Sequence, residues 1–599
     1  MCALGNRHQQ RAPHRSRSAN PCTNFGHFVC AGWKHHHSEQ SVRAFYYKNA
    51  LETLMRAARY LRVPPSHQNA KQQAAALLAT CDSVKNGERN EIDIVKRYLA
   101  EAGVVWPQRA SNPDVLNTIL YLDIELNWAA FVRVRERRER GRSVVSITVA
   151  QSFHVIRESS SRLSGEGKRS YFDTLYQHYS GRESSDAAFE EILEAEKVTA
   201  RLSSLLGKAE WEPINEATMF PSVREWREAL RMRMPTMLPD VTFDTNRARF
   251  FTHFFDIWRQ QGERKMHMGV SWNAVQYAAL SASRQLLMNN YGKTPEKGFE
   301  FRKFCLIMIY QHMGDLVFAG FDQAVFFERA RDDVMNLVYA VRRSFTDRLA
   351  KRQALAQKLD MTTQWSSVES VFSVLEHHRY FDYNAPAPGF PDMNRTHFVP
   401  NWRKVAKAWR SGAFVKGQLT AKDILSYNFF SVDWLNGDFV LSPFALSFPL
   451  YDMELTAALK YGGLGSEVAL ASAVILLDRY MQHGRNDSET GAALRRTVAC
   501  VERSRRGLPE ARHNVLAELA SLEALVDAFQ AADGSDHREL EGFGDYTATQ
   551  MFFIAWCFMR CGVEDDPCSL ALRNVRRFSQ AFHCPRHTLL NPASTCEVL

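Results

Sequence analysis

Histidine and carboxylate side chains that could bind a metal are present, but they do not form a recognised catalytic pattern. A zinc hydrolase needs three protein ligands and an open position for water, whose pKa the metal lowers to about 7. The usual source of two ligands is H-E-x-x-H, which places both histidines on one helical face beside a general-base glutamate. The chain contains neither this pattern nor a G-x-S-x-G serine elbow. We interpret the histidines at 35–37 as a surface loop that binds metal weakly at most, and Glu376-His377-His378 lacks helical ligand spacing to a partner.

Motifs near both ends and in the middle of the chain carry a resemblance to a known family. Each terminal run combines aromatic residues with two cysteines, and a glycine-rich turn at 461–465 opens an apolar stretch. The matching residues are Pro21, Cys22, Asn24, Phe25, Phe28, Cys30, Gly32, Trp33, Met313, Gly314, Val317, Ala458, Leu459, Tyr461, Gly462, Gly463, Gly465, Asp478, Phe578, Ala581, Phe582, Cys584, Asn591, Pro592, Cys596 and Val598. In this order they resemble the neprilysin family of zinc metalloendopeptidases, which includes neprilysin-like and endothelin-converting-enzyme-like proteins.

The resemblance implies a zinc site whose chemistry this chain has lost. When the chain is aligned without a gap on the family's active-site helix, H-E-x-x-H falls on residues 470–474. Leu470 and Val474 take the histidine positions, and Ala471 takes that of the general base. Aliphatic side chains have no lone pair to offer a metal. With Ile475 and Leu477 nearby, the helix becomes apolar on nearly every side, and we expect it to be buried without an ion.

The other catalytic positions that the resemblance implies have also changed. The family's third zinc ligand, a glutamate, corresponds to Asn514, and the aspartate that supports a histidine ligand corresponds to Glu518. A shift of one residue would put His513 at the ligand position instead. The histidine that steadies the oxyanion corresponds to Asp565, whose carboxylate would repel it. We therefore predict no catalytic residue and no bound cofactor, zinc being the metal of active relatives.

The strand that docks a peptide backbone in the family, N-A-[FY]-Y, has kept its rings and lost its asparagine–alanine pair. It corresponds to Tyr427, Asn428, Phe429 and Phe430. We predict that these four residues contact a bound peptide.

A second hypothesis is that other residues have rebuilt a metal site. Asp478, His483, His513 and Glu518 are the nearby candidates. At least three of them would have to converge within about 2.0–2.2 Å of one point to hold zinc. The chain would then be a zinc metalloendopeptidase that cleaves extracellular peptides.

The chain has eleven cysteines, whose number alone does not fix a connectivity. Stable bridges require an oxidising compartment, and the alternative is a cytosolic protein with reduced thiols. Cys561 and Cys568 are close enough in sequence for a local bridge, and Cys2 is left over. The resemblance implies the pairs Cys22–Cys584, Cys30–Cys557, Cys81–Cys305 and Cys500–Cys596.

The apolar periodicity predicts a mainly α protein. Apolar residues recur at three- and four-residue spacing over 46–61, 185–206, 303–327, 330–357 and 513–530, and the best extended segments, 427–431 and 438–441, flank Asn436-Gly437, a hairpin signal. The resemblance implies a two-lobed neprilysin-like fold, with a thermolysin-like lobe of few short strands and a helical cap lobe around a central chamber. We expect a disordered basic tail at 1–20, a peptidase-like lobe at 21–60 plus 395–599, and the cap at 61–394.

The net charge of +9 is modest for 599 residues, and its densest run, 133–142, includes two glutamates. We interpret that run as a solvated helix face and predict no nucleic-acid partner. No stretch of 18 apolar residues and no apolar segment in residues 1–20 is present, so we predict no membrane span and see no signal peptide. Asn394 and Asn486 begin glycosylation sequons.

These observations favour a catalytically inactive neprilysin-like protein that binds peptides or an extracellular protein partner. The family resemblance implies an extracellular or cell-surface location, so either the targeting segment was lost or the N-terminus is incomplete. A purely structural or dimerising paralogue is the third hypothesis.

Overall fold

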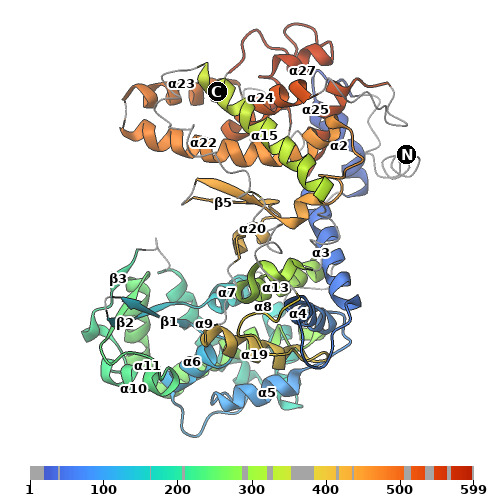
Figure 1. Cartoon of the computed structure of the whole chain (residues 1–599). Coiled ribbons are helices and arrows are strands. Elements are labelled where there is room, and N and C mark those ends of the chain that lie inside the picture. The colour runs from blue at the N-terminus through green and yellow to red at the C-terminus, as the bar shows by residue number, and fades with distance from the viewer. Residues whose placement is uncertain are drawn as a thin grey trace. The chain divides into compact units, whose positions relative to one another are not determined.

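The structure, a computed structural model, describes most of the chain. The described residues are 19–37, 41–139, 141–161, 163–205, 210–286, 295–319, 328–351, 371, 384–412, 417–434, 437–486, 488–504, 515–532, 545–562 and 568–596. They form two compact units, which are described separately, and both are mainly helical (Figure 1).

The first unit comprises Met1–Ala57, Phe318–Asp382 and Gly417–Leu599. Its centre is a layer of apolar helices, in which α22 (Ser466–Asn486) and α15 (Glu328–Ala350) both pack against α24 (Val515–Ala532). The Ser344 hydroxyl on α15 donates to the carbonyl of Ala524 at 2.6 Å. The other elements are α2 (Phe25–His36), most of α3 (Val42–Tyr60), α20 (Ala421–Leu425), β5 (Phe430–Asp433), β6 (Asp438–Leu441), η4 (Pro443–Leu446), α21 (Ala457–Lys460), η5 (Tyr461–Gly465), α23 (Ser488–Ser504), α25 (Ala548–Phe558), α26 (Ser569–Leu572) and α27 (Arg576–Ala581).

The second unit comprises Ala58–Val317 and Tyr383–Lys416. Helix α4 (Ala70–Lys85) packs against α13 (Pro295–Met313) and α19 (Phe398–Arg410), and the indole of Trp402 donates to the carbonyl of Leu126 at 3.0 Å. The other helices are α5 (Ile92–Glu101), α6 (Val115–Ile124), α7 (Gln151–Ser161), α8 (Gly165–Ser180), α9 (Asp186–Ser203), η1 (Glu216–Thr218), α10 (Val223–Arg233), α11 (Ala248–Ala279) and η2 (Gly314–Phe318), which ends at the unit boundary.

The boundaries of the two units differ from the lobe boundaries that we expected from the sequence. α15 lies in the first unit because its partners, the carbonyl of Ala524 and the carboxylate of Glu523, are on α24. α19 lies in the second unit with α4 and α6. The proline-rich stretch between them is bound within the second unit, where the backbone N–H of Ala70 donates to the carbonyl of Ala385 at 2.8 Å.

The five helices that the periodicity predicts are all present, as α3, α9, α13, α15 and α24, with ends shifted by several residues. Ser185 begins α9, because its hydroxyl accepts the backbone N–H of Ala188 at 3.2 Å. The predicted hairpin is also present, and it pairs Phe430 with Leu441 and Asp433 with Asp438 as antiparallel strands β5 and β6.

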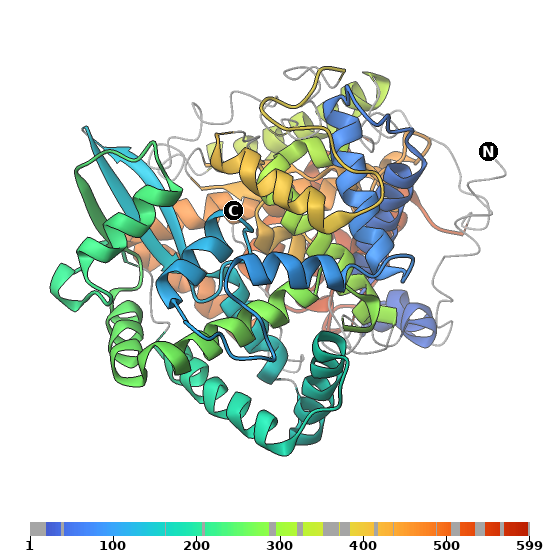
Figure 2. The same ribbon diagram turned by 90° about the horizontal axis from the view of Figure 1, so that it is seen from below.

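Residues 133–142 do not form the solvated helix face that we predicted. They belong to a hairpin of β1 (Val132–Glu139) and β2 (Arg142–Val149), part of a sheet with strand order β1-β2-β4-β3 (Figures 1 and 2). β4 (Val241–Thr245) runs parallel to β2, and β3 (Glu212–Pro213) is antiparallel to β4. Val132 and Val134 on β1 are buried, whereas Arg133 pairs with Asp123 and Arg137 with Asp244. The alternation of apolar and charged residues at 132–135 has the period of a strand.

Five disulfides connect ten cysteines. The bridges Cys22–Cys584, Cys81–Cys305 and Cys500–Cys596 are the ones that the family resemblance implied. The expected Cys30–Cys557 pair is wrong, because Cys30 bonds Cys561, and Cys557 bonds Cys568. The expected local bridge of Cys561 to Cys568 is wrong for the same reason. Cys557 and Cys561 are four residues apart at the end of α25, so sequence alignment distinguishes them poorly.

Peptide mapping of the oxidised protein under non-reducing conditions tests this connectivity. We expect one cross-linked species that contains Cys30 with Cys561 and another that contains Cys557 with Cys568, because the Cα atoms of these pairs lie 5.3 Å and 5.6 Å apart, within the range of a disulfide. A species joining Cys30 to Cys557 would contradict the structure, and the Cys81–Cys305 bridge inside the second unit serves as the internal control.

One helical stretch of the described residues, Ala457–Met481, is long and apolar enough to cross a membrane by length and composition. However, 83% of its most apolar window is buried inside the protein. The stretch therefore has the environment of a core helix in the first unit.

Candidate functional site

The glycine-rich turn at the start of α22 is held by close backbone contacts. The N–H of Leu464 donates to the carbonyl of Leu450 at 2.8 Å. A Cβ atom on Gly463 would collide with that same carbonyl oxygen, and one on Gly462 would lie 2.6 Å from the Cβ of Ala555 on α25. Only hydrogen atoms fit at these two positions, so the glycines that match the family motif are required for packing.

The three residues that we aligned with the family's ligand and base positions lie on α22, which follows this turn. Ala471 is fully buried, whereas Leu470 and Val474 are only half-buried. Because they are four residues apart, Leu470 and Val474 lie on one face of the helix, as two histidine ligands would. The helix is mostly buried, as expected, and this face presents two aliphatic side chains. These side chains do not fit a zinc ion.

A buried ion pair holds α22 one turn before these positions. The carboxylate of Glu467 is 1% exposed and bonds to the guanidinium of Arg43 on α3. The Arg43 guanidinium also lies 5.4 Å from the ring centre of Phe429. Sequence reasoning missed this pair, although a glutamate inside an apolar helical run is a signal, since a buried carboxylate needs a partner.

The position of the family's supporting aspartate has likewise acquired an arginine partner. Glu518 on α24 accepts hydrogen bonds of 2.9 Å and 2.7 Å from the guanidinium of Arg560. That guanidinium stacks 3.9 Å from the ring of Trp556. A carboxylate that accepts two hydrogen bonds from one guanidinium forms a structural ion pair with it. Glu518 is therefore not available to orient a metal-bound histidine.

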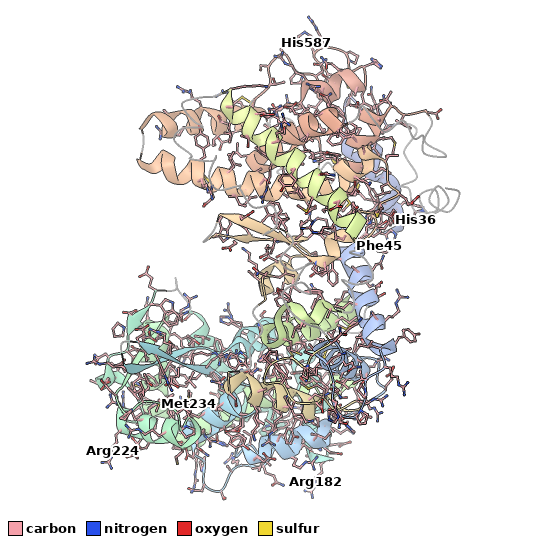
Figure 3. All side chains as sticks on the ribbon, in the orientation of Figure 1. His36, Phe45, Arg182, Arg224, Met234 and His587 are labelled. Atoms are coloured by element: carbon pink, nitrogen blue, oxygen red, sulfur yellow. A yellow bond between two sulfur atoms is a disulfide. The ribbon has the colours of Figure 1, made fainter. Side chains whose placement is uncertain are left out.

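Few of the remaining candidates for a metal site lie among the residues that the structure describes. Among the described residues there is no cluster of three or more histidine, cysteine, aspartate or glutamate side chains that could hold a metal ion. Asn514, His513 and Asp565 lie outside the described residues, as does the side chain of His483. The histidine cluster at 35–37 is on the last turn of α2, where His36 is exposed at the surface of the unit (Figure 3).

The strand predicted to contact peptide is built from core and edge residues. Phe429 is fully buried with its ring centre 5.7 Å from that of Tyr47. The side-chain amide of Asn428 donates to Asp423 at 3.1 Å, so it is used inside this segment. Phe430 begins β5, which pairs with β6 on one side, and on its other side β5 has no strand in the part of the chain that the structure describes.

The retained tyrosine of the motif is also a packing residue. Tyr461 is 7% exposed, and its ring centre lies 6.0 Å from that of Phe529 on α24. Burial, with a smaller contribution from Asp333, raises the pKa of Tyr461 to about 12. The phenol is therefore neutral at physiological pH.

Two glycine substitutions test whether this motif has a packing role. Gly463→Ala should lower the free energy of unfolding by about 2 kcal/mol or more, because the new methyl group meets a backbone oxygen that cannot move aside. Gly465→Ala is the matched control, since its methyl group would meet the flexible Leu525 side chain at 3.2 Å. Chemical denaturation of both variants measures the difference, and equal stabilities would contradict the packing role.

Comparisons with known proteins agree on one family. The sequence model of peptidase family M13 matches residues 21–361, more than half of the chain. Neprilysin-1 of Trittame loki is 20% identical over 97% of this chain and 92% of its own length. Human endothelin-converting enzyme 1 is 22% identical, but the match covers 49% of this chain and less than half (44%) of that enzyme.

Solved structures of low sequence identity share the fold. Mycobacterium tuberculosis zinc metalloprotease ZMP1, solved in complex with an inhibitor, has a TM-score of 0.60 at 14% identity and covers 98% of both chains. PEPO from Lactobacillus rhamnosis has a TM-score of 0.62 at 11% identity, covering 96% of this chain and 98% of its own. These likenesses concern the fold alone.

Proposed function

The chain belongs to peptidase family M13, and we propose that it is a catalytically inactive member whose first unit binds extended peptides. The observation that carries the proposal is the replacement of both ligand positions and of the general base by Leu470, Val474 and Ala471 in a helix whose frame is intact. Peptide hydrolysis in a zinc enzyme depends on a metal-activated water, and these side chains neither bind the metal nor accept the proton of the water.

Binding of a peptide is supported by the open edge of β5. The backbone N–H of Ser442 donates to the carbonyl of Phe429 at 2.9 Å, which makes these two residues a hydrogen-bonded pair. Since such pairs alternate along antiparallel strands, the N–H and C=O groups of Phe430 and Val432 point away from β6. An extended peptide added at this edge would receive main-chain hydrogen bonds from both residues.

The apolar face of α22 supports the same proposal. β5 and α22 pack against each other in the first unit. Leu470 and Val474 are half-buried, so they offer apolar surface at positions where a zinc site would have polar ligands. Side chains of a bound peptide could therefore gain burial energy, about 25 cal/mol for each Å² of apolar surface removed from water.

We further propose an extracellular or cell-surface location. Five disulfides form and persist in an oxidising compartment. Of the two predicted glycosylation sites, Asn394 lies in the turn before α19 and is partly exposed, and Asn486 is the last residue of α22. Relatives such as endothelin-converting enzyme 1 support this location only through membership of the same family.

Peptide binding without cleavage is the test of this function. Fluorescein-labelled octapeptides rich in leucine and phenylalanine should bind the oxidised protein, as measured by fluorescence anisotropy. Val432→Pro should weaken that binding by about tenfold or more, because proline removes a donor at the open edge and leaves the pairing with β6 intact. Val432→Ala, which keeps the N–H, is the matched control and should bind nearly as well as wild type.

The same peptides should remain uncut when chromatography follows the mixture over a day. Wild-type binding by Val432→Pro, with an unchanged melting temperature, would overturn the proposed edge. Chelator-sensitive cleavage would instead favour a rebuilt zinc site and would overturn the proposed loss of activity.

A further inference from the structure

A pocket of about 540 Å³ is lined entirely by residues of the second unit. It is enclosed by the segment 106–113 and by helices α8, α9 and α11. A volume of this size falls in the range of small-molecule sites, which is roughly 300–1,000 Å³. Neither the proposed function nor the family's zinc chemistry uses these residues.

One wall of the pocket is aromatic. The indole of Trp106 lies with its ring centre 6.2 Å from that of Phe172 and 5.8 Å from that of Tyr176, and both neighbours meet it edge-on. All three side chains line the pocket. Because aromatic rings prefer offset or edge-to-face contacts with other rings, this wall favours a ligand with a planar aromatic group.

The rim of the pocket is positively charged. Arg109, Arg264 and Lys265 line it, and the one carboxylate among the lining residues, Glu191, is paired with Arg109. Arg264 and Lys265 are exposed and form no ion pair with a described residue. The excess of positive charge therefore favours an anionic ligand, and its effect decreases with added salt.

The inner part of the pocket contains a histidine with an unsatisfied nitrogen. His267 is 6% exposed, and its Nδ1 lies 3.3 Å from the hydroxyl of Ser271, which also lines the pocket. Its Nε2 is buried without a hydrogen-bond partner. Burial lowers the pKa of His267, so the ring is neutral at physiological pH. Because no water-sized atom reaches Nε2, His267 lines the pocket as a neutral ring and offers a ligand no hydrogen bond through that nitrogen.

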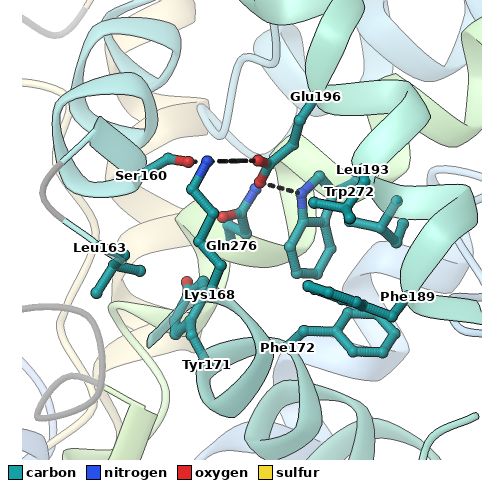
Figure 4. Close-up of a pocket in the computed structure, with 11 residues that line it drawn as sticks. Ser160, Leu163, Lys168, Tyr171, Phe172, Phe189, Leu193, Glu196, Trp272 and Gln276 are labelled. Carbon is teal, nitrogen blue, oxygen red and sulfur yellow. Dashed lines mark hydrogen bonds and ion pairs between the residues drawn. The ribbon is translucent and has the colours of Figure 1, made fainter. Parts of the chain in front are cut away.

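A neighbouring cavity has a carboxylate that is paired within the protein. It shares Phe172 and Ile192 with the pocket, but its volume of about 10 Å³ has room for roughly one water molecule. Figure 4 shows its polar side chains meeting at one carboxylate, Glu196, which lies 3.3 Å from both the Lys168 amine and the Trp272 indole N–H. Its buried charge is satisfied within the protein, in contrast to His267.

We propose that this pocket is a binding site for an aromatic carboxylate. The ring of the ligand would pack on Trp106 and Tyr176, and its carboxylate would face Arg264 and Lys265. An acylated aromatic amino acid has both groups. The same chemistry occurs in a free small molecule and at the C-terminus of a peptide that ends in an aromatic residue.

Isothermal titration of the full-length oxidised protein with N-acetyl-tryptophan tests the proposal. We expect saturable binding with a Kd below about 1 mM, and N-acetyl-tryptophan amide, which lacks the carboxylate, should bind about tenfold more weakly or worse. An octapeptide with a C-terminal tryptophan identifies the source of the ligand, since tighter binding of the peptide indicates a chain end and tighter binding of the small molecule indicates a free ligand. Absent binding of both, or equal binding of acid and amide, would overturn the site.

Substitutions of the rim residues test whether this binding takes place in the pocket. Arg264→Ser with Lys265→Ser should weaken acid binding by about tenfold, whereas Arg249→Ser, an exposed arginine elsewhere on α11, should leave it unchanged. The rim variants change exposed residues, so we expect them to fold as the wild type does. Wild-type affinity in the double rim variant would contradict the proposal.

Discussion

The close approach of the chain at Gly462 and Gly463 is the constraint on which the first unit depends. Leu450 and α25 reach the backbone at these two residues, and no side chain fits between them. The hydrogen bond from Leu464 to Leu450 then fixes where α22 begins. From that point α22 packs against α24, and α24 against α15. A change at the glycines would therefore shift the helix that carries Leu470, Ala471 and Val474.

Ion pairs, rather than metal ligands, are the polar contacts of this region. Glu467 is paired with Arg43, and Glu518 with Arg560, and in each pair the carboxylate is mostly buried. Removing one member of such a pair leaves an uncompensated charge, which costs about 3–5 kcal/mol when the site is buried. The two pairs connect α22 to α3 and α24 to α25's C-terminal end. The region is a well-packed scaffold whose half-buried aliphatic face on α22 adjoins the open strand β5.

Much of the fold followed from sequence because long helices have a strong periodic signal. The failures have local causes. The charges in residues 133–142 favour a helix face, but alternation with Val132 and Val134 marks a strand, in which Arg133 and Arg137 have carboxylate partners. Cys557 and Cys561 lie on adjacent turns, so their partners depend on the orientation of α25. At the site, the sequence alone identifies the aliphatic residues Leu470, Ala471 and Val474. The partners of Glu467 and Glu518 could not be predicted, because they depend on packing between segments that are distant in sequence.

The central claim is that hydrocarbon side chains occupy the positions where zinc would need ligands, and metal content tests it most directly. The oxidised full-length protein would be incubated with excess zinc, freed of unbound ions by gel filtration, and measured by plasma mass spectrometry against an active M13 peptidase. The account predicts that the peptidase retains stoichiometric zinc and that this chain does not. Retention of one tightly held zinc ion per chain would contradict it.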